Sequence, residues 1–162
     1  MKFHRLSKSD LRRVCEEFAG LGVGSRVKEG AVLEDEGARL YWLDGLILAQ
    51  EGGLRFPALD EQANATLLRS MPSLVVDMGA VAKIAGGADV MGPGVVKVRG
   101  NFGAGNLVVV RDERHDRALA ICRALVDSGS IQPRSRGRVA ENIHHPGDRV
   151  WRLMERLREL LS

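Results

Sequence analysis

The sequence is poor in aromatic residues and cysteine, and it has no long apolar run. Aromatic side chains make up 4% of the 162 residues, so a core drawn from its 44% apolar residues must be mainly aliphatic. No apolar stretch reaches the roughly 18 residues that a membrane-spanning helix needs, and residues 1–5 lack the apolar segment of a secretion signal. Cys15 and Cys122 stand far apart, which favours free thiols in a reducing compartment. We therefore expect a cytoplasmic protein without a membrane partner.

Catalytic and metal-binding patterns are also missing. His144 and His145 are adjacent, and neighbouring residues on a strand point to opposite faces, so they do not readily share one ion. No serine lies in a GxSxG elbow, and the loop at 100–106 has neither the spacing nor the following helix of a dinucleotide-binding GxGxxG motif. Asp77 and Asp89 are more simply explained as a helix cap and a loop brace than as a catalytic pair. We predict no enzyme activity, no cofactor and no metal site.

Positive charge is concentrated in the second half of the chain. Residues 1–72 carry 10 Lys and Arg against 11 Asp and Glu, whereas residues 73–162 carry 14 against 10. Most of the excess lies in residues 97–138, where 9 basic side chains accompany 4 acidic ones. A block of one sign suits a polyanion, because each phosphate that a cation neutralises releases counterions. An arginine-rich surface that is merely solvated would give the same count.

Residues 1–72 predict a small α+β domain. Ser7 fits the start of a capping box, and the apolar residues that follow it recur at helical spacing. Asp44-Gly45, between two apolar runs, predicts a two-residue hairpin turn. Around it we expect strands at 27–34 and 39–43, and a second helix near 60–69. Met71-Pro72 breaks that helix and marks the expected domain boundary.

The segment 76–98 carries the densest local signals of the second half. Asp77 is placed to cap a short helix, because its carboxylate can accept from the first free backbone N–H groups. Gly86 and Gly87 end that helix, since glycine reaches the left-handed conformation without a Cβ clash. The following loop is expected to leave backbone N–H groups bare, where a phosphate oxygen can approach them. Glycine-rich turns without a ligand are the plainer alternative.

A second turn and a strand complete this segment. Pro93-Gly94 suits a type II turn, because proline presets the first φ and glycine supplies the positive second one. The strand expected at 95–99 alternates, so that Lys97 and Arg99 point outward while valines point inward. We therefore expect a half-buried strand that carries basic groups on the surface.

The remainder of the second half is rich in strands. The run at 117–126 is ambiguous, because its alanines and leucines also have good helix propensity. Its alternation of large apolar and small residues favours a strand. Further strands are expected at 107–111 and 138–144, with an exposed basic connection at 128–137. From Asp148, which can cap, apolar residues at helical spacing predict a final amphipathic helix.

The order of residues in 74–151 resembles the signature of the PUA domain, an RNA-binding module. The resemblance is carried by Val-Asp-Met-Gly-Ala at 76–80, by Gly-Ala-Asp-Val-Met-Gly-Pro-Gly-Val at 87–95, and by the closing strand and turn at 137–144 and 147–151. With a small domain in front of it, the whole chain is similar to the malignant T-cell amplified sequence family and its archaeal relatives. The likeness of the first seventy or so residues is one of architecture only.

This resemblance implies an α+β protein in two parts, a small N-terminal α+β (pre-PUA) domain at 1–72 and a PUA-type β pseudo-barrel with short helices at 73–162, the C-terminal helix included. It implies a non-catalytic RNA-binding protein that takes structured RNA, tRNA or rRNA, in translation or ribosome function. The small ribosomal subunit is an implied partner, and the N-terminal domain is expected to contact the ribosome or a partner protein. The alternatives are an accessory RNA-binding subunit of an RNA-modifying enzyme and a protein-interaction module.

The resemblance also implies one RNA-binding face, formed by the short helix, the glycine loop, the next strand and the closing strand. Its amides would hold phosphate oxygens, and the wide, shallow minor groove of A-form RNA would be read by shape. Where the family often has a basic residue this chain has Met78, and Lys83 is expected to take over that contact. The candidate RNA-binding residues are Gly79, Ala80, Lys83, Gly86, Gly87, Ala88, Asp89, Met91, Gly92, Pro93, Gly94, Lys97, Arg99, Arg138, Asn142 and His144.

Overall fold

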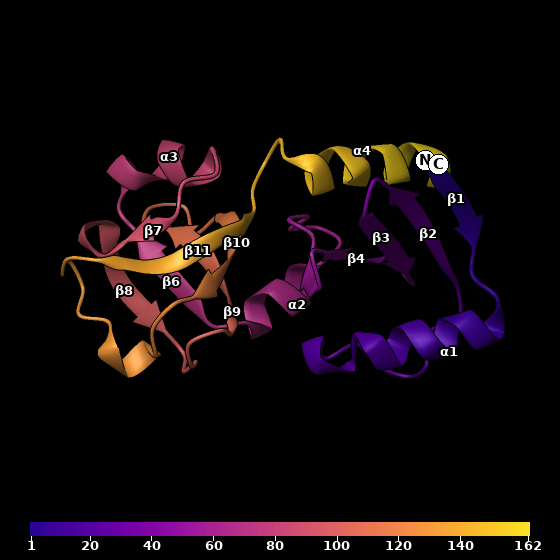
Figure 1. Cartoon of the computed structure of the whole chain (residues 1–162), viewed down its shortest axis with the longest axis horizontal. Coiled ribbons are helices and arrows are strands. Elements are labelled where there is room, and N and C mark those ends of the chain that lie inside the picture. Colours follow the sequence, from indigo (N-terminus) through magenta and orange to yellow (C-terminus); the bar gives the residue numbers. More distant parts are fainter. The chain divides into compact units, whose positions relative to one another are not determined.

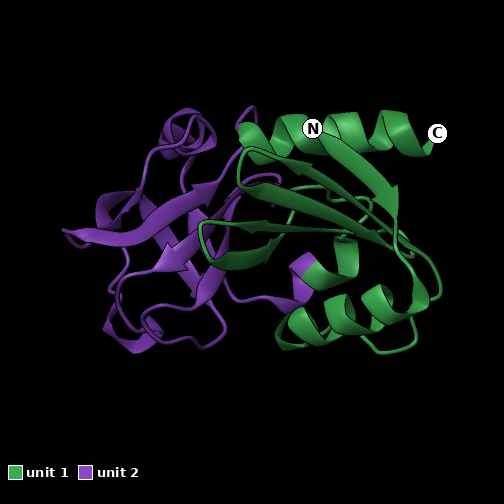
Figure 2. Cartoon of the chain, turned by 45° about the vertical axis from the view of Figure 1, so that its right-hand side comes forward, with its two compact units in different colours: residues 1–67, 149–162 green, residues 68–148 purple.

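A computed structural model describes all 162 residues, and the chain passes twice between two compact units (Figure 1). The first unit comprises Met1–Leu67 and Arg149–Ser162, and the second comprises Leu68–Asp148 (Figure 2). The sequence prediction placed the final helix with the second domain, whereas here it belongs to the first unit. The reason is packing, because the apolar stripe of this helix is buried and the helix contacts strands β2 and β3 of the first unit's sheet.

The first unit is built on a five-stranded antiparallel sheet in the order β1-β2-β3-β4-β5. The strands are β1 (Lys2–Arg5), β2 (Gly30–Asp35), β3 (Ala38–Leu43), β4 (Leu46–Glu51) and β5 (Leu54–Pro57). Two-residue turns join the last four, and each of the six turn residues has positive φ, as type I′ turns require. The predicted Asp44-Gly45 hairpin is confirmed, with φ values of 46° and 99°. Strands β1 and β5 were not predicted.

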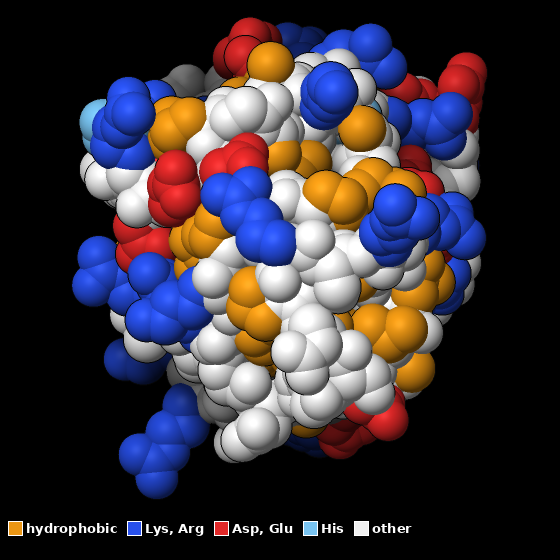
Figure 3. All heavy atoms as spheres, turned by 90° about the vertical axis from the view of Figure 1, so that its left-hand side faces the viewer, with side chains coloured by type: hydrophobic (Ala, Val, Ile, Leu, Met, Phe, Trp, Pro, Cys, Tyr) orange, Lys and Arg blue, Asp and Glu red, His pale blue; other side chains and the backbone are white.

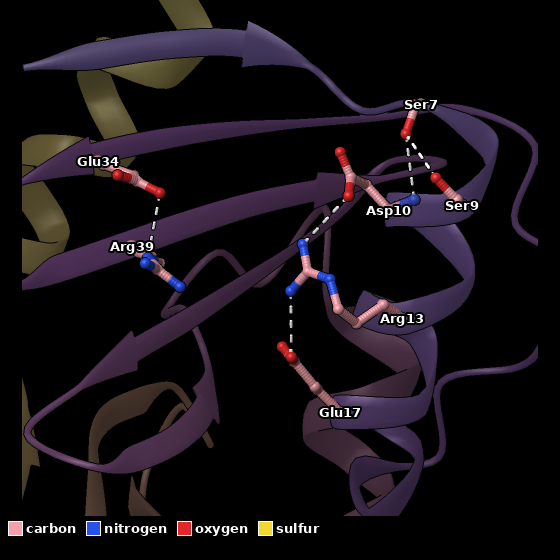
Figure 4. A network of polar contacts seen from close by, with 7 residues as sticks. All are labelled: Ser7, Ser9, Asp10, Arg13, Glu17, Glu34 and Arg39. Carbon is pink, nitrogen blue, oxygen red and sulfur yellow. Dashed lines mark hydrogen bonds and ion pairs between the residues drawn. The ribbon is translucent and has the colours of Figure 1, made fainter.

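Three helices accompany this sheet: α1 (Lys8–Glu17), α2 (Ala65–Ser70), which crosses into the second unit, and α4 (Arg149–Leu161). The predicted cap is confirmed, because Ser7 Oγ accepts from Asp10 N at 3.2 Å. Figure 4 shows this cap with Arg13, which reaches both Asp10 and Glu17 from one face of α1. No helix of the chain is long and apolar enough to cross a lipid bilayer.

The second helix of the first unit is shorter than expected, and a buried asparagine lies directly before it. The segment near 60–69 was predicted to be helical throughout, but α2 begins only at Ala65. Asn64 is fully buried just before it and bonds to β4 in both directions. Its Oδ1 accepts from Ile47 N at 3.0 Å, and its Nδ2 donates to Ile47 O at 2.7 Å and to Ala58 O at 2.8 Å. These bonds satisfy backbone groups that a buried chain cannot leave unpaired.

The second unit is a curled six-stranded sheet in the order β7-β11-β10-β9-β6-β8. Its strands are β6 (Ser73–Val76), β7 (Val90–Met91), β8 (Val95–Arg99), β9 (Leu107–Asp112), β10 (Ala118–Ala124) and β11 (Arg138–His144). All pairs are antiparallel except β6 with β9. Only Gly92–Gly94 separates the two edge strands β7 and β8, so the sheet must curl until its edges meet. The expected pseudo-barrel is confirmed.

The ambiguous run at 117–126 forms strand β10, as the alternation favoured. Four successive residues, Leu119, Ala120, Ile121 and Cys122, are all buried, because β10 lies between β9 and β11 and is covered on both faces. A central strand of this kind has no polar face. The alanines of this run, whose helix propensity made the prediction ambiguous, therefore lie in the core of the barrel.

Candidate nucleic-acid interface

The candidate face begins where β6 ends, at Asp77. A 3₁₀ turn (Met78–Ala80) follows and runs directly into helix α3 (Val81–Ala85). The predicted cap is confirmed, because Asp77 Oδ1 accepts from Ala80 N at 3.0 Å. The other carboxylate oxygen forms an ion pair with Arg134, whose Nη1 also donates to Pro93 O at 3.0 Å. One arginine thus ties the start of α3 to the Gly92–Gly94 turn.

The end of α3 is a Schellman motif. Gly87 N donates to Ile84 O at 3.0 Å and Ala88 N donates to Lys83 O at 2.9 Å, the two bonds that define this helix end. Gly87 has φ +107°, and a Cβ there would lie 2.8 Å from His145 Nε2. The glycine stop is therefore confirmed. The expectation of bare amides is wrong for this part of the loop, because Gly86 N also donates, to Ala82 O.

The turn between β7 and β8 differs from the predicted type II turn. Gly92–Gly94 forms a 3₁₀ turn, and Gly94 has no positive φ. Gly92 N donates to Gly137 O at 2.7 Å, so this amide is also occupied. A Cβ at Gly92 would lie 1.9 Å from Ser135 O. Glycine is needed here for the close approach of two backbones rather than for a left-handed conformation.

Asp89 braces the loop against the closing strand, as predicted. Its Oδ1 accepts from Asn142 N and its Oδ2 from Arg138 Nη1, both at 2.9 Å. Asn142 Nδ2 in turn donates to Ile84 O at 3.0 Å and to Ala88 O at 2.9 Å. Arg138 and Asn142 therefore hold the loop on β11 in the free protein, and Arg138 already has a carboxylate partner.

The Asp89 brace should make stability depend on pH. The hydrogen bond from Asn142 N lowers the pKa of Asp89, burial opposes the shift, and the Arg138 guanidinium lowers that pKa further. A lowered folded-state pKa contributes stability above the unfolded value of about 3.9, and this contribution is lost as the pH falls through the folded-state pKa. We expect Asp89→Asn to lower the melting temperature at pH 7. Thermal melts across pH should show that gap to wild type narrowing below about pH 4; a gap independent of pH would contradict the assignment.

A pocket of about 340 Å³ lies between α3 and the Gly92–Gly94 turn. Asp77 and Ile84 form part of its wall, and eight of the sixteen candidate residues form the rest: Gly79, Ala80, Lys83, Ala88, Asp89, Met91, Pro93 and Gly94. Met91 is half exposed, at 50%, and offers an apolar contact at the rim. The two carboxylates of the lining, Asp77 and Asp89, are each paired with an arginine.

Lys83 and Lys97 are the two cations of the candidate set that carry no carboxylate partner. Both are exposed, Lys83 on α3 and Lys97 on β8, and neither forms an ion pair. The outward direction of Lys97 and Arg99 on β8 is as predicted. Arg99, however, pairs with Asp116 at 2.7 Å and lines a different pocket. Lys83 lines the first pocket, whereas Lys97 lies outside its lining, on the strand that follows the Gly92–Gly94 turn.

His144 does not reach the surface, although it belongs to the candidate set. Its side chain is fully buried, and its Nδ1 lies 2.9 Å from Asp148 Oδ2. The pair closes the turn after β11, because Asp148 Oδ2 also accepts from His145 N. Gly92 is buried as well. These two positions shape the face without offering it an exposed side chain.

Arg134 is the residue that sequence reasoning missed. The connection at 128–137 was recognised as basic and exposed, but no role was assigned within it. Arg134 lies 57 positions from Asp77 and takes a left-handed φ of 68° to reach it. No local pattern encodes a contact over that distance, so only the folded chain reveals it. Figure 3 shows this end of the second unit, with Lys and Arg side chains around a central area of backbone and apolar atoms.

Comparison with known proteins finds a family model that matches part of the chain. The PUA domain matches residues 72–146. Among solved structures, the chain is similar to a conserved PUA-domain protein from Thermoplasma acidophilum, with a TM-score of 0.76 and 25% identity over 94% of this chain and 99% of that one. It is also similar to a hypothetical protein from Pyrococcus horikoshii, with a TM-score of 0.74 and 28% identity over the same shares.

Among curated proteins, the chain is similar to translation machinery-associated protein 20 of Saccharomyces cerevisiae. The two are 29% identical over 124 residues, which is 70% of this chain and 65% of the yeast protein. The chain spans about half to two thirds of the length of the curated relatives it matches. The similarity therefore reaches beyond the second unit and includes part of the first.

Proposed function

We propose that this chain is a non-catalytic RNA-binding protein that acts in translation, because the PUA domain matches its residues 72–146. PUA domains generally bind RNA, and the yeast relative is named for the translation machinery. The finer proposal is that the bound RNA is structured, a tRNA or rRNA, and that binding takes place in the cytoplasm. The small ribosomal subunit is the proposed setting.

The observation that carries the proposal is the combination of a pocket with unpaired lysines. Both carboxylates in the pocket wall are neutralised by Arg134 and Arg138, so the charge of Lys83 and Lys97 is left for a ligand. A phosphate at either lysine would gain charge-assisted hydrogen bonds and release counterions. Met91 and Pro93 add apolar surface of the kind on which a sugar or base edge rests.

The arrangement fits recognition by shape. Backbone and small side chains make up most of the pocket wall, which allows a ribose–phosphate backbone to approach closely. Double-stranded RNA is bound mainly through phosphates and 2′-hydroxyls across its wide minor groove. The face has no row of hydrogen-bonding side chains that would read base edges. We therefore propose binding that depends on RNA structure more than on sequence.

The buried thiol of the second unit supports the non-catalytic part of the proposal. Burial, together with the negative charge of Asp89, raises the pKa of Cys122 to about 12. Such a thiol stays protonated at neutral pH, whereas a nucleophilic cysteine needs a lowered pKa. Its position in the core of the barrel gives it a packing role.

A salt titration tests the proposed function. A filter-binding experiment would use an RNA duplex of about 16 base pairs, a length that double-stranded RNA binders span. If about three phosphates are neutralised, affinity should fall roughly 40-fold between 50 and 200 mM salt. A DNA duplex of the same sequence serves as the control and should bind more weakly, because it lacks the 2′-hydroxyls. Binding that ignores salt, or that favours neither duplex, would contradict the proposal.

A further inference from the structure

Strand β1 leaves one edge of the first unit's sheet open. It pairs with β2 on one side and with no strand on the other, and Figure 1 shows it at the margin of that sheet. The opposite edge is less suited to pairing, because β5 ends at Pro57, which has no N–H group to donate, and its Phe56 is fully buried. An unprotected edge is a template onto which another extended chain can add.

The backbone groups on the outer side of β1 are those of Phe3 and Arg5. Leu6 N donates to Gly30 O at 2.9 Å, so Leu6 bonds toward β2, and the direction of bonding alternates along an antiparallel strand. The N–H and C=O groups of Phe3 and Arg5 therefore point away from β2. In the structure no hydrogen bond reaches these four groups. They form a row of two donors and two acceptors along the edge.

This edge is also positively charged. The first eight residues include Lys2, Arg5 and Lys8 and contain no Asp or Glu. All three side chains are exposed, and none forms an ion pair. The carboxylate opposite Lys2 in the ladder belongs to Glu34, and it is taken by Arg39, whose Nε lies 3.1 Å from Glu34 Oε1 (Figure 4). The charge of the edge is therefore left for a partner.

We propose that an extended, acidic segment of a partner protein adds to the outer edge of β1 as a further strand of this sheet. Backbone pairing satisfies the outward groups of Phe3 and Arg5, and carboxylates on the added strand face Lys2 and Arg5. Phe3 is half-buried and offers an apolar contact between the two charges. RNA binding by the second unit is not required for this contact.

Charge and hydrogen-bonding geometry favour this occupant over a second copy of the chain and over RNA. Two β1 edges would bring like charges together, which is one way in which natural edge strands avoid self-association. A phosphate group only accepts hydrogen bonds, so phosphates cannot satisfy the outward C=O groups of Phe3 and Arg5. An extended peptide supplies both donors and acceptors.

Titration of the full chain with short peptides tests the contact. The probe is an acetylated and amidated peptide with the core Glu-Thr-Val-Glu, whose antiparallel register sets the glutamates opposite Arg5 and Lys2 and the valine opposite Phe3. We expect the backbone amide resonances of Phe3 and Arg5 to shift and their hydrogen exchange to slow, because both amides become bonded. A Lys-Thr-Val-Lys peptide keeps the apolar contact and should bind about tenfold more weakly, since its charges repel the edge.

Two N-methylated forms of the acidic peptide separate backbone pairing from charge. Methylation of the valine nitrogen blocks the N–H that donates to Phe3 O and should abolish binding. Methylation of the threonine nitrogen, which points away from β1, should leave binding largely unchanged.

A matched pair of variants makes the same separation in the protein. Arg5→Gln removes a charge, whereas Arg5→Pro removes the same charge together with an outward N–H donor, and it should weaken binding of the acidic peptide further. Proline is tolerated on an edge strand where the N–H faces solvent, so both variants should stay folded.

Several results would overturn the proposal. An acidic peptide that shifts neither amide would do so, as would equal binding of the acidic and basic peptides or of the two methylated forms. Shifts of the Phe3 and Arg5 amides caused by an RNA duplex would make the edge a phosphate surface instead. Shifts that follow protein concentration alone would make it an interface between copies of this chain. Loss of RNA binding by the wild type would remove the proposed function but leave the peptide result standing.

Discussion

Replacing Lys83 and Lys97 together with glutamate is expected to lower the affinity for an RNA duplex on the order of a hundredfold at about 100 mM salt. Each substitution removes a cation that has no carboxylate partner in the free protein and puts a negative charge in its place. The variant loses two phosphate contacts, and its new carboxylates repel the phosphates of the RNA. Both side chains are exposed, so the melting temperature should change little. Filter binding of wild type and variant across salt would measure the effect.

The matched control is the double variant Lys2→Glu and Lys8→Glu, which changes the net charge by the same amount in the first unit. It should retain most of the RNA affinity, because long-range charge alone is screened over a distance of about 10 Å at this salt concentration. An equal loss in both variants would mean that total charge matters rather than the face near α3. Full binding by the Lys83 and Lys97 variant would favour the protein-interaction alternative instead.

Gly92→Ala is expected to lower the free energy of unfolding by about 2–4 kcal/mol, a large effect for a single methyl group. Its Cβ would lie 1.9 Å from Ser135 O, a backbone atom that cannot rotate away. Relief requires the two backbones to separate, and this breaks the 2.7 Å bond from Gly92 N to Gly137 O. The turn also carries Pro93, which accepts from Arg134, so the pocket should be distorted as well. Urea unfolding with linear extrapolation would measure the loss.

Two glycines provide a graded control for this substitution. A Cβ at Gly129 would meet nothing within 4 Å, so Gly129→Ala should change stability by no more than about 0.5 kcal/mol. A Cβ at Gly94 would lie 3.2 Å from Ala80 Cβ, a side-chain contact that can give way, and an intermediate effect is expected. An order of effects other than Gly92, Gly94, Gly129 would contradict the close-approach explanation.

The sequence predicted elements whose cause is local. Ser7 caps α1 through a bond to a residue three positions on, and Asp44-Gly45 forms a turn within four residues. The bounds of β8 and β11 agree with the expected ranges. Alternation and flanking glycines mark β8, whereas β11 was expected from its resemblance to the closing strand of the PUA domain. The PUA signature was recognised because its residues are close together in the chain. Such features need only neighbours along the backbone, and a sequence displays those directly.

Contacts between segments that are distant in the chain could not be predicted from the sequence. The bare loop amides were expected because glycine-rich loops often leave them free, but three carbonyls of α3 and the Gly137 carbonyl occupy four of them. The turn at Pro93-Gly94 was expected to need a left-handed glycine, while the glycine that matters is Gly92, packed against Ser135. The contact between Arg134 and Asp77 likewise depends on the closed sheet. The partners of Gly92 and Arg134 lie more than 30 positions away, and no spacing rule reveals them.

The return of α4 to the sheet of the first unit bears on the order in which the protein can mature on the ribosome. All of Leu68–Asp148 is synthesised before α4, so the second unit can close while the first still lacks a helix. Until then the face of β2 and β3 that contacts α4 stays open to other chains, a hazard for any partly made protein. A nascent chain of this protein would thus finish its later portion first and its earlier portion last.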